Sequence, residues 1–189
     1  LAPGARLKVI DVARLRLGRT DAAGRIERLN NGEWRLALRG PTIDLSPILD
    51  SDDEATDPPK TADEAPSNPL ALDLRVAADT LTLTKKATFT RATLAVRSTG
   101  KRLESLDLRG RVGEGYAALT VQPIDGQRRL TLRAEDAGEF LRALDIVDTI
   151  RGGRLGVDGR LTGDGLEDGL LMTARIEEFH VVQAPVLAS

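Results

Sequence analysis

The sequence predicts a mainly β fold: a curved antiparallel sheet that forms an open groove or half-barrel, with one or two short helices. Apolar and polar residues alternate with a period of two along most of the chain, and successive side chains of a strand point to opposite faces. Turn-forming pairs such as Asn31-Gly32 and Asp125-Gly126 interrupt this alternation at short intervals, as in an antiparallel meander. Only 3% of the 189 residues are aromatic, so aliphatic side chains must form the apolar face.

The expected strands begin near the N-terminus, where Leu7, Val9, Leu15 and Leu17 share one parity, and continue with the alternation of Trp34, Leu36 and Leu38. A last strand is expected over residues 176–182. In the strands between, one side of each strand is aliphatic, and these residues are the candidates to line a groove. They are Leu70, Leu72, Leu74, Val76, Leu81, Leu83, Leu94, Val96, Leu106, Leu108, Leu119, Val121, Leu130, Leu132, Leu155, Val157 and Leu161.

An acidic, proline-rich segment over residues 50–69 separates the N-terminal strands (1–49) from the main β region (70–189). Its composition buries too little apolar surface to offset the entropy of ordering. We therefore expect a flexible linker inserted between two parts of one sheet. The chain starts with Leu1 and stops in mid-alternation at Ser189, which predicts one domain cut from a longer chain.

A short helix is expected near residues 136–145. Asp136 is a suitable N-cap with Glu139 three residues later, and Phe140, Leu141 and Leu144 would share one face. A second helix is expected to begin at Ala184-Pro185, because proline suits the first helical turn.

The composition excludes several classes of function. With no cysteine and one histidine, the chain lacks the residues for a disulfide, a thiol nucleophile or a cysteine or multi-histidine metal site. The 27 basic and 29 acidic residues give a net charge of −2, which argues against a nucleic-acid partner. No apolar run reaches 18 residues, so no transmembrane helix is predicted within the chain.

No motif predicts a catalytic residue, a metal site or a cofactor. Asp50, Asp52 and Glu54 lack the glycine and the distal glutamate of a calcium loop, and the glycine-rich stretch 152–159 occurs once rather than as a stacked repeat. His180 stands without a nucleophile motif. The serines match neither the nucleophile elbow nor the Ser-x-x-Lys motif. The sequence therefore predicts a protein that is not an enzyme.

Three segments of the C-terminal half carry a family resemblance. They are a helix start at Asp136-Ala137-Gly138, a strand start at Gly152-Gly153-Arg154-Leu155, and a strand that runs from Phe179 to Ala184-Pro185. In this order they resemble the AsmA-like superfamily of bacterial envelope proteins, especially the C-terminal region of its YhdP-type members. The positions that match the family pattern, and to which the resemblance assigns a structural role, are Asp136, Gly138, Gly152, Gly153, Phe179, Ala184 and Pro185.

The resemblance implies a location and a function. Proteins of this superfamily are anchored in the inner membrane of Gram-negative bacteria, extend through the periplasm and form curved antiparallel sheets with an apolar groove. They are implicated in phospholipid transport between the inner and outer membranes and in outer-membrane integrity. By resemblance, this chain is a periplasmic segment, its partners are phospholipid acyl chains, and the membrane anchor of its parent lies outside the segment.

Two alternatives stand beside this interpretation. The segment is expected to bind acyl chains along a groove or, alternatively, to be a non-enzymatic structural or protein-interaction module of the cell envelope. The same aliphatic residues also suit the closed core of an ordinary sandwich. A groove needs many interchangeable aliphatic contacts, each worth about 0.8 kcal/mol per buried methylene, and no fixed catalytic groups.

Overall fold

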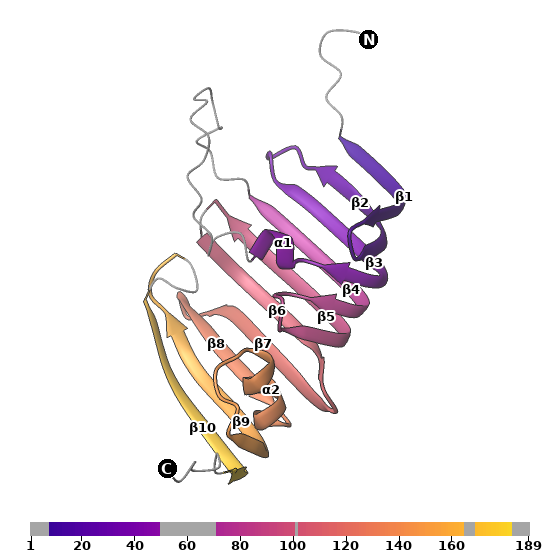
Figure 1. Ribbon diagram of the computed structural model, residues 1–189. Coiled ribbons are helices and arrows are strands. Elements are labelled where there is room, and N and C mark those ends of the chain that lie inside the picture. Colours follow the sequence, from indigo (N-terminus) through magenta and orange to yellow (C-terminus); the bar gives the residue numbers. More distant parts are fainter. Residues whose placement is uncertain (1–7, 50–70, 101, 165–168, 183–189) are drawn as a thin grey trace, which may run out of the picture.

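The protein is one ten-stranded sheet, described here by a computed structural model for residues 8–49, 71–100, 102–164 and 169–182. The strand order in space is the strand order in the sequence, from β1 at one edge to β10 at the other (Figure 1). The strands are β1 (Val9–Leu17), β2 (Thr20–Arg28), β3 (Trp34–Asp44), β4 (Leu72–Thr82), β5 (Thr88–Thr99), β6 (Arg102–Val112), β7 (Gly115–Ile124), β8 (Gln127–Ala134), β9 (Ile150–Leu161) and β10 (Leu170–Val181). The predicted fold class, a mainly β protein with an open, curved sheet, is confirmed.

One pairing departs from the expected antiparallel arrangement. β3 and β4 are parallel, with Trp34 beside Leu72 at one end and Asp44 beside Thr82 at the other, whereas the other eight pairs are antiparallel. A parallel pair needs a crossover connection of a dozen or more residues. Residues 45–71 supply this connection, which gives the inserted segment a topological reason. The predicted linker, 50–69, lies outside the described residues.

The predicted turns fall between antiparallel strands. Between β7 and β8, Ile124 pairs with Gln127, and the two residues of the loop, Asp125 and Gly126, both have positive φ, at 51° and 75°. This is the geometry of a two-residue type I′ hairpin, which favours Asp-Gly because the glycine adopts positive φ without steric cost. The Asp-Gly pair in the sequence was thus a reliable turn signal.

In the part of the chain that the structure describes, two short helices accompany the sheet, α1 (Ser46–Leu49) and α2 (Ala137–Ala143). The helix expected at 136–145 is α2, and the Asp136 side chain caps it by accepting a hydrogen bond from the Glu139 backbone N–H at 2.9 Å. The helix expected at Ala184-Pro185 lies outside the described residues. α1 was not expected from the sequence. Among the described residues, no helix is both long and apolar enough to cross a bilayer.

The hydrophobic core is a single cluster on one face of the sheet. Ile43, Leu81 and Val121 are its most deeply buried large side chains, and Ala137 and Phe140 of α2 belong to the same cluster. Among the described strands no second sheet covers this face. The helix α2 packs on this face and contributes to its burial.

Candidate functional site

A continuous row of apolar residues crosses the sheet at right angles to its strands. Residues that are directly opposite each other in neighbouring strands share a face, so the register identifies the row. It contains one residue from each strand and no charged side chain. This first apolar row consists of Val12, Gly24, Leu38, Val76, Leu94, Leu108, Leu119, Leu132, Val157 and Ala174.

A second apolar row lies beside the first, two residues along each strand and on the same face. It too takes one residue from each of the ten strands and contains no polar side chain. The second apolar row consists of Ile10, Ile26, Leu36, Leu74, Val96, Leu106, Val121, Leu130, Gly159 and Met172. We call the surface formed by the two rows the apolar trough.

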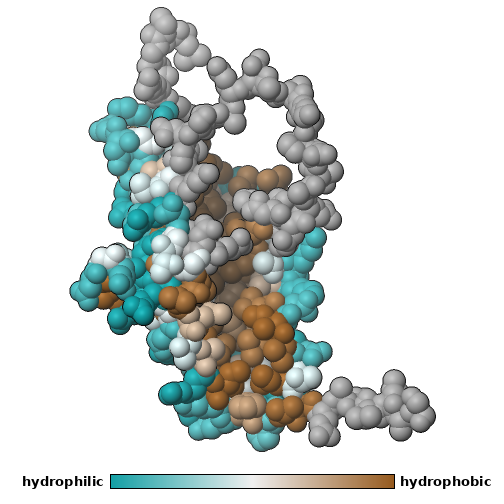
Figure 2. All heavy atoms as spheres, turned by 90° about the vertical axis from the view of Figure 1, so that its left-hand side faces the viewer, coloured by the Kyte–Doolittle hydropathy of each residue, from teal (hydrophilic) through white to brown (hydrophobic). Residues whose placement is uncertain are grey.

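The apolar trough is recessed and runs along the direction in which the strands are stacked. Figure 2 shows it as a hydrophobic strip between hydrophilic margins. Its middle is the most deeply buried part, with Val121 at 0% exposure, while the end residues Ile10 and Met172 are 38% and 62% exposed. The apolar surface therefore reaches solvent at both ends of the sheet.

A row of small residues borders the trough. It contains Gly40, Ala78, Ala92, Gly110, Ala117 and Ala134. The space is tight, because a Cβ atom on Gly40 would lie 2.6 Å from the Cα of Ala22. The register between β5 and β6 also shifts here, and Arg91 has a positive φ of 49°. These features allow the strands to bend at this row.

Beyond this row, the buried residues switch from even to odd positions in the sequence. On β4 the next buried residue after Ala78 is Leu81, and on β5 the next one before Ala92 is Phe89. The predicted groove residues Leu81 and Leu83 therefore belong to a margin of the trough and not to its two rows. Simple alternation did not anticipate this change, because the bend depends on contacts between strands.

Most of the predicted groove residues lie together on this face. Eleven of the seventeen form part of the two rows: Leu74, Val76, Leu94, Val96, Leu106, Leu108, Leu119, Val121, Leu130, Leu132 and Val157. Leu72 and Leu161 lie next to the second row, Leu155 continues the row of small residues, and Leu70 lies outside the described residues. All sixteen described candidates are buried or half-buried.

The prediction missed the contribution of the terminal strands. Ile26, Leu36 and Leu38 extend the rows into β2 and β3, and Met172 and Ala174 extend them into β10. The alternation of Leu36 and Leu38 was visible in the sequence. What was missing was the parallel pairing of β3 with β4, which places both residues on the same face as Leu74 and Val76.

The residues of the family pattern hold α2 against β9. A Cβ atom on Gly138 would lie 2.6 Å from the backbone oxygen of Ile150, so only glycine allows this approach. Gly152 and Gly153 have φ values of 61° and 83° at the start of β9, and Gly152 pairs with Phe179 of β10. Together with the hydrogen bond by which Asp136 caps α2, these contacts stabilise the fold. Ala184 and Pro185 lie outside the described residues.

The opposite face of the sheet is polar and carries ion pairs between neighbouring strands. Asp73 accepts hydrogen bonds from Arg35 and Arg75, each at 3.3 Å, and Asp158 accepts from Arg133 at 2.9 Å. The Arg133–Asp158 pair is exposed and contributes little to stability, whereas Asp73 is buried beneath its two arginines. The arrangement of these ion pairs makes the two faces of the sheet chemically distinct, one aliphatic and one charged.

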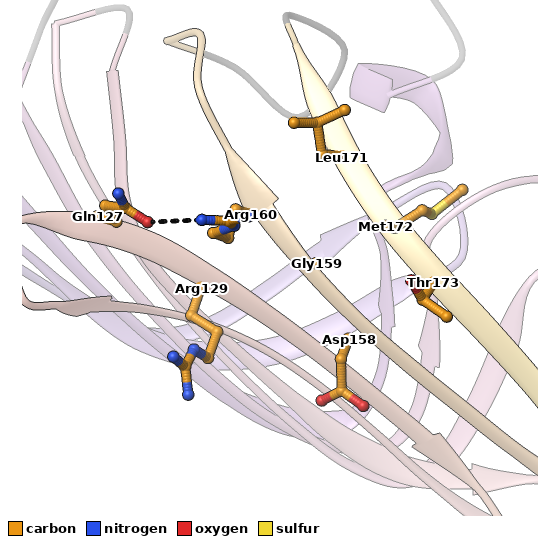
Figure 3. A pocket seen from close by; sticks show the side chains of 8 residues that line it. All are labelled: Gln127, Arg129, Asp158, Gly159, Arg160, Leu171, Met172 and Thr173. Carbon is orange, nitrogen blue, oxygen red and sulfur yellow. Dashed lines mark hydrogen bonds between the residues drawn. The ribbon is translucent and has the colours of Figure 1, made fainter.

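A cavity of about 520 Å³ lies on the polar side near the β10 edge. The side chains of Gln127, Arg129, Asp158 and Arg160 line it (Figure 3), and Gln127 accepts a bond from Arg160 at 3.5 Å. Asp158 is engaged by Arg133. Thr173 also lines the cavity, but its hydroxyl makes no hydrogen bond to the Asp158 carboxylate, which Arg133 holds, so the geometry does not indicate a catalytic site.

Asp44 is the titratable group with the most contacts at the margin that carries α1. Its carboxylate accepts hydrogen bonds from the Ser46 hydroxyl at 2.6 Å, the Ser46 backbone N–H at 3.0 Å and Arg19 Nε at 2.7 Å. The Ser46 hydroxyl bond is the main cause that lowers the pKa of Asp44 below its ordinary value, and Arg19 lowers it further. Asp44 therefore remains ionised while it holds α1 to the end of β3.

Among the described residues, no group of three or more histidine, aspartate or glutamate side chains is arranged to hold a metal ion. His180 is exposed on β10, opposite Arg151. No family model, curated protein or solved structure matches the chain. The apolar trough is therefore the candidate site.

Proposed function

We propose that this chain binds the acyl chains of phospholipids along the apolar trough and that it is a periplasmic segment of an AsmA-like envelope protein. One observation carries the proposal: two uncharged aliphatic rows cross all ten strands and reach solvent at both ends. An ordinary globular core has no need for such continuity from one sheet edge to the other.

The dimensions of the trough suit an acyl chain. Ten strands spaced about 4.8 Å apart give a path of about 43 Å along the sheet. The hydrocarbon core of a bilayer is about 30 Å thick, so one leaflet contributes about half of that. The trough is therefore longer than one extended acyl chain, and burial of each methylene stabilises the complex by about 0.8 kcal/mol.

The chemistry of the lining suits movement as well as binding. Leucine, isoleucine and valine offer similar contacts at every strand, so a lipid that shifts by one strand exchanges equivalent neighbours. In this proposal the parent protein is anchored in the inner membrane and passes phospholipids between the inner and outer membranes, which supports outer-membrane integrity. The resemblance of the segments around Asp136, Gly153 and Phe179 supports this location.

A second candidate function is a structural or protein-interaction module of the cell envelope. The observation in its favour is the edge strand β10, on which Leu171, Val181 and Met172 are each more than 60% exposed. An edge strand with exposed apolar side chains can add a strand from a partner. This function would use the edge of the sheet and would leave the trough empty.

Lipid extraction tests the proposal. The chain is purified from a bacterial host, and the bound lipid is measured by mass spectrometry for three proteins: the wild type, Val96→Asp and Thr93→Asp. Val96 lies in the second apolar row of β5, whereas Thr93 is exposed on the polar face of the same strand. We expect about tenfold less lipid with Val96→Asp and an unchanged amount with Thr93→Asp.

Folding is checked by circular dichroism, and Val96→Thr provides a milder change of nearly the same shape should the aspartate variant unfold. If the wild type carries no lipid, or if both aspartate variants retain it equally, the trough does not bind acyl chains. The interaction module would be favoured if the folded wild type carries no lipid and if substitution of Leu171 impairs its function in the envelope.

A further inference from the structure

A buried arginine lies on the apolar face at one margin of the trough. Arg128 of β8 is opposite Leu161 of β9, which is opposite Leu170 of β10, and this short row adjoins the second apolar row. Arg128 is only 5% exposed, and no carboxylate among the described residues pairs with it. Burial of a charged group is costly unless hydrogen bonds compensate it, so the acceptors around Arg128 determine what else it can bind.

The contacts of Arg128 use only part of its guanidinium group. Nη1 donates to the backbone oxygens of Leu103 at 2.7 Å and Asp164 at 2.9 Å. The Leu103 backbone N–H also donates to the Asp164 oxygen at 3.0 Å, so the start of β6 meets the connection between β9 and β10. Within the described part of the chain, Nε and Nη2 have no hydrogen-bond partner.

Arg128 lines a cavity of about 370 Å³ together with Arg102 and Arg160. Asp164 is the one acidic residue in the described lining, to which three arginines contribute, Arg128 from the apolar face and Arg160 from the polar face at this end of the strands. Arg160 is held by a long bond of 3.5 Å to Gln127, a contact visible in Figure 3. Arg102 is half exposed in its pair with Glu104, at 3.3 Å. Both side chains are therefore available to an anion.

We propose that this cavity binds a phosphate group. The planar guanidinium fork matches phosphate oxygens, and hydrogen bonds between the two charged groups are strong. Leu161, which lies opposite Arg128 on the apolar face, also lines the cavity, so its wall passes from cationic to aliphatic on that face. If the proposed function holds, on which this extension rests, the phosphate is that of a phospholipid whose acyl chains lie along the adjacent trough. A free phosphate ion presents the same oxygen atoms to the arginines, so the experiment must distinguish the two ligands.

The experiment compares three probes on the full chain: inorganic phosphate, a short-chain phosphatidic acid and the diacylglycerol with the same acyl chains. Binding is measured by calorimetry for the wild type, the double variant Arg102→Gln/Arg160→Gln, and the control Arg129→Gln. Arg129 is exposed on the polar face of the same strand as Arg128. Arg128→Lys supplements the series, since it keeps the charge and removes the fork.

We expect the double variant to bind phosphatidic acid about tenfold more weakly, with diacylglycerol and the control variant unaffected. If inorganic phosphate binds in an arginine-dependent way and neither glyceride binds, the phosphate site stands while the proposed function fails. If the double variant and Arg128→Lys, both folded, bind phosphatidic acid as the wild type does, the phosphate site is refuted while the trough proposal survives through diacylglycerol.

Discussion

Leu38 of β3 lies directly beside Val76 of β4, in the one parallel pair among the described strands. This contact joins the three N-terminal strands to the other seven and continues the first apolar row without a break. Between Asp44 and Leu72 the chain must therefore return along the full length of one strand. The connection is a requirement of the topology and not a dispensable insertion.

Shortening the connection tests this requirement. The return path is about 33 Å, the length of ten steps along a strand. Removal of residues 55–64 leaves 17 connecting residues, and we expect stability to change by less than about 1 kcal/mol. Removal of 50–69 leaves seven, which span at most about 25 Å, so β3 cannot pair with β4. Urea unfolding followed by the fluorescence of Trp34 measures both; equal stability of the two deletions would contradict the parallel pairing.

Truncation of a fully buried side chain should show that the one-sided core stabilises the fold. Leu81 is 0% exposed, so Leu81→Ala should lower the free energy of unfolding by about 2–5 kcal/mol. Leu171 is 64% exposed, and Leu171→Ala should change it by less than about 0.5 kcal/mol. Urea titrations of the two variants provide the measurement. Similar losses for both would mean that the face around Leu81 is not buried.

Two glycine-to-alanine substitutions should affect stability in opposite ways, one through a steric clash in the folded state and one through the entropy of the unfolded chain. In Gly40→Ala the new Cβ would meet the Ala22 backbone at 2.6 Å, so we expect a loss of about 2 kcal/mol or more. Gly156 has its nearest neighbour at 3.5 Å, the flexible Arg133 side chain, and Gly156→Ala should be neutral or slightly stabilising. Thermal unfolding distinguishes them, and a tolerated alanine at position 40 would refute the close approach of β2 and β3.

The contribution of Asp44 to stability should disappear in acid. Its pKa is lower in the folded protein than the ordinary value of about 3.9, so its contribution is complete above that value and is lost as the pH falls through the folded-state pKa. We expect wild type and Asp44→Asn to differ most near pH 6, and the difference to shrink as the pH falls below the ordinary carboxyl pKa. Urea unfolding across this range is the measurement, with Asp79→Asn as the control. A difference that is constant with pH would contradict this assignment.

The fold class and most of the trough were predictable because they depend on local signals. The alternation of residues such as Leu106 and Leu108 reports which side of a strand is buried, and Asp125-Gly126 reports where the chain reverses. Asp136 with Glu139 was sufficient to place α2. These signals are encoded within a few residues and need no knowledge of distant neighbours.

The remaining features depend on contacts between distant parts of the chain. Nothing local to Leu38 shows that it lies beside Val76, and the change of buried parity before Leu81 follows from a bend that several strands share. Arg128 is a charged residue that is only 5% exposed. Its guanidinium is held by the backbone oxygens of Leu103, in β6, and Asp164, in the connection between β9 and β10.

The agreement between sequence order and spatial order has a consequence for how such a protein can change in length. Each antiparallel hairpin pairs its strands only with its immediate neighbours in the chain, so a hairpin duplicated or lost within the sheet leaves the pairing of the other strands in register. Every such event would lengthen or shorten the molecule by about 10 Å and would preserve its cross-section. Evolution can therefore adjust the distance that the protein spans by copying one modular unit, without redesigning the whole.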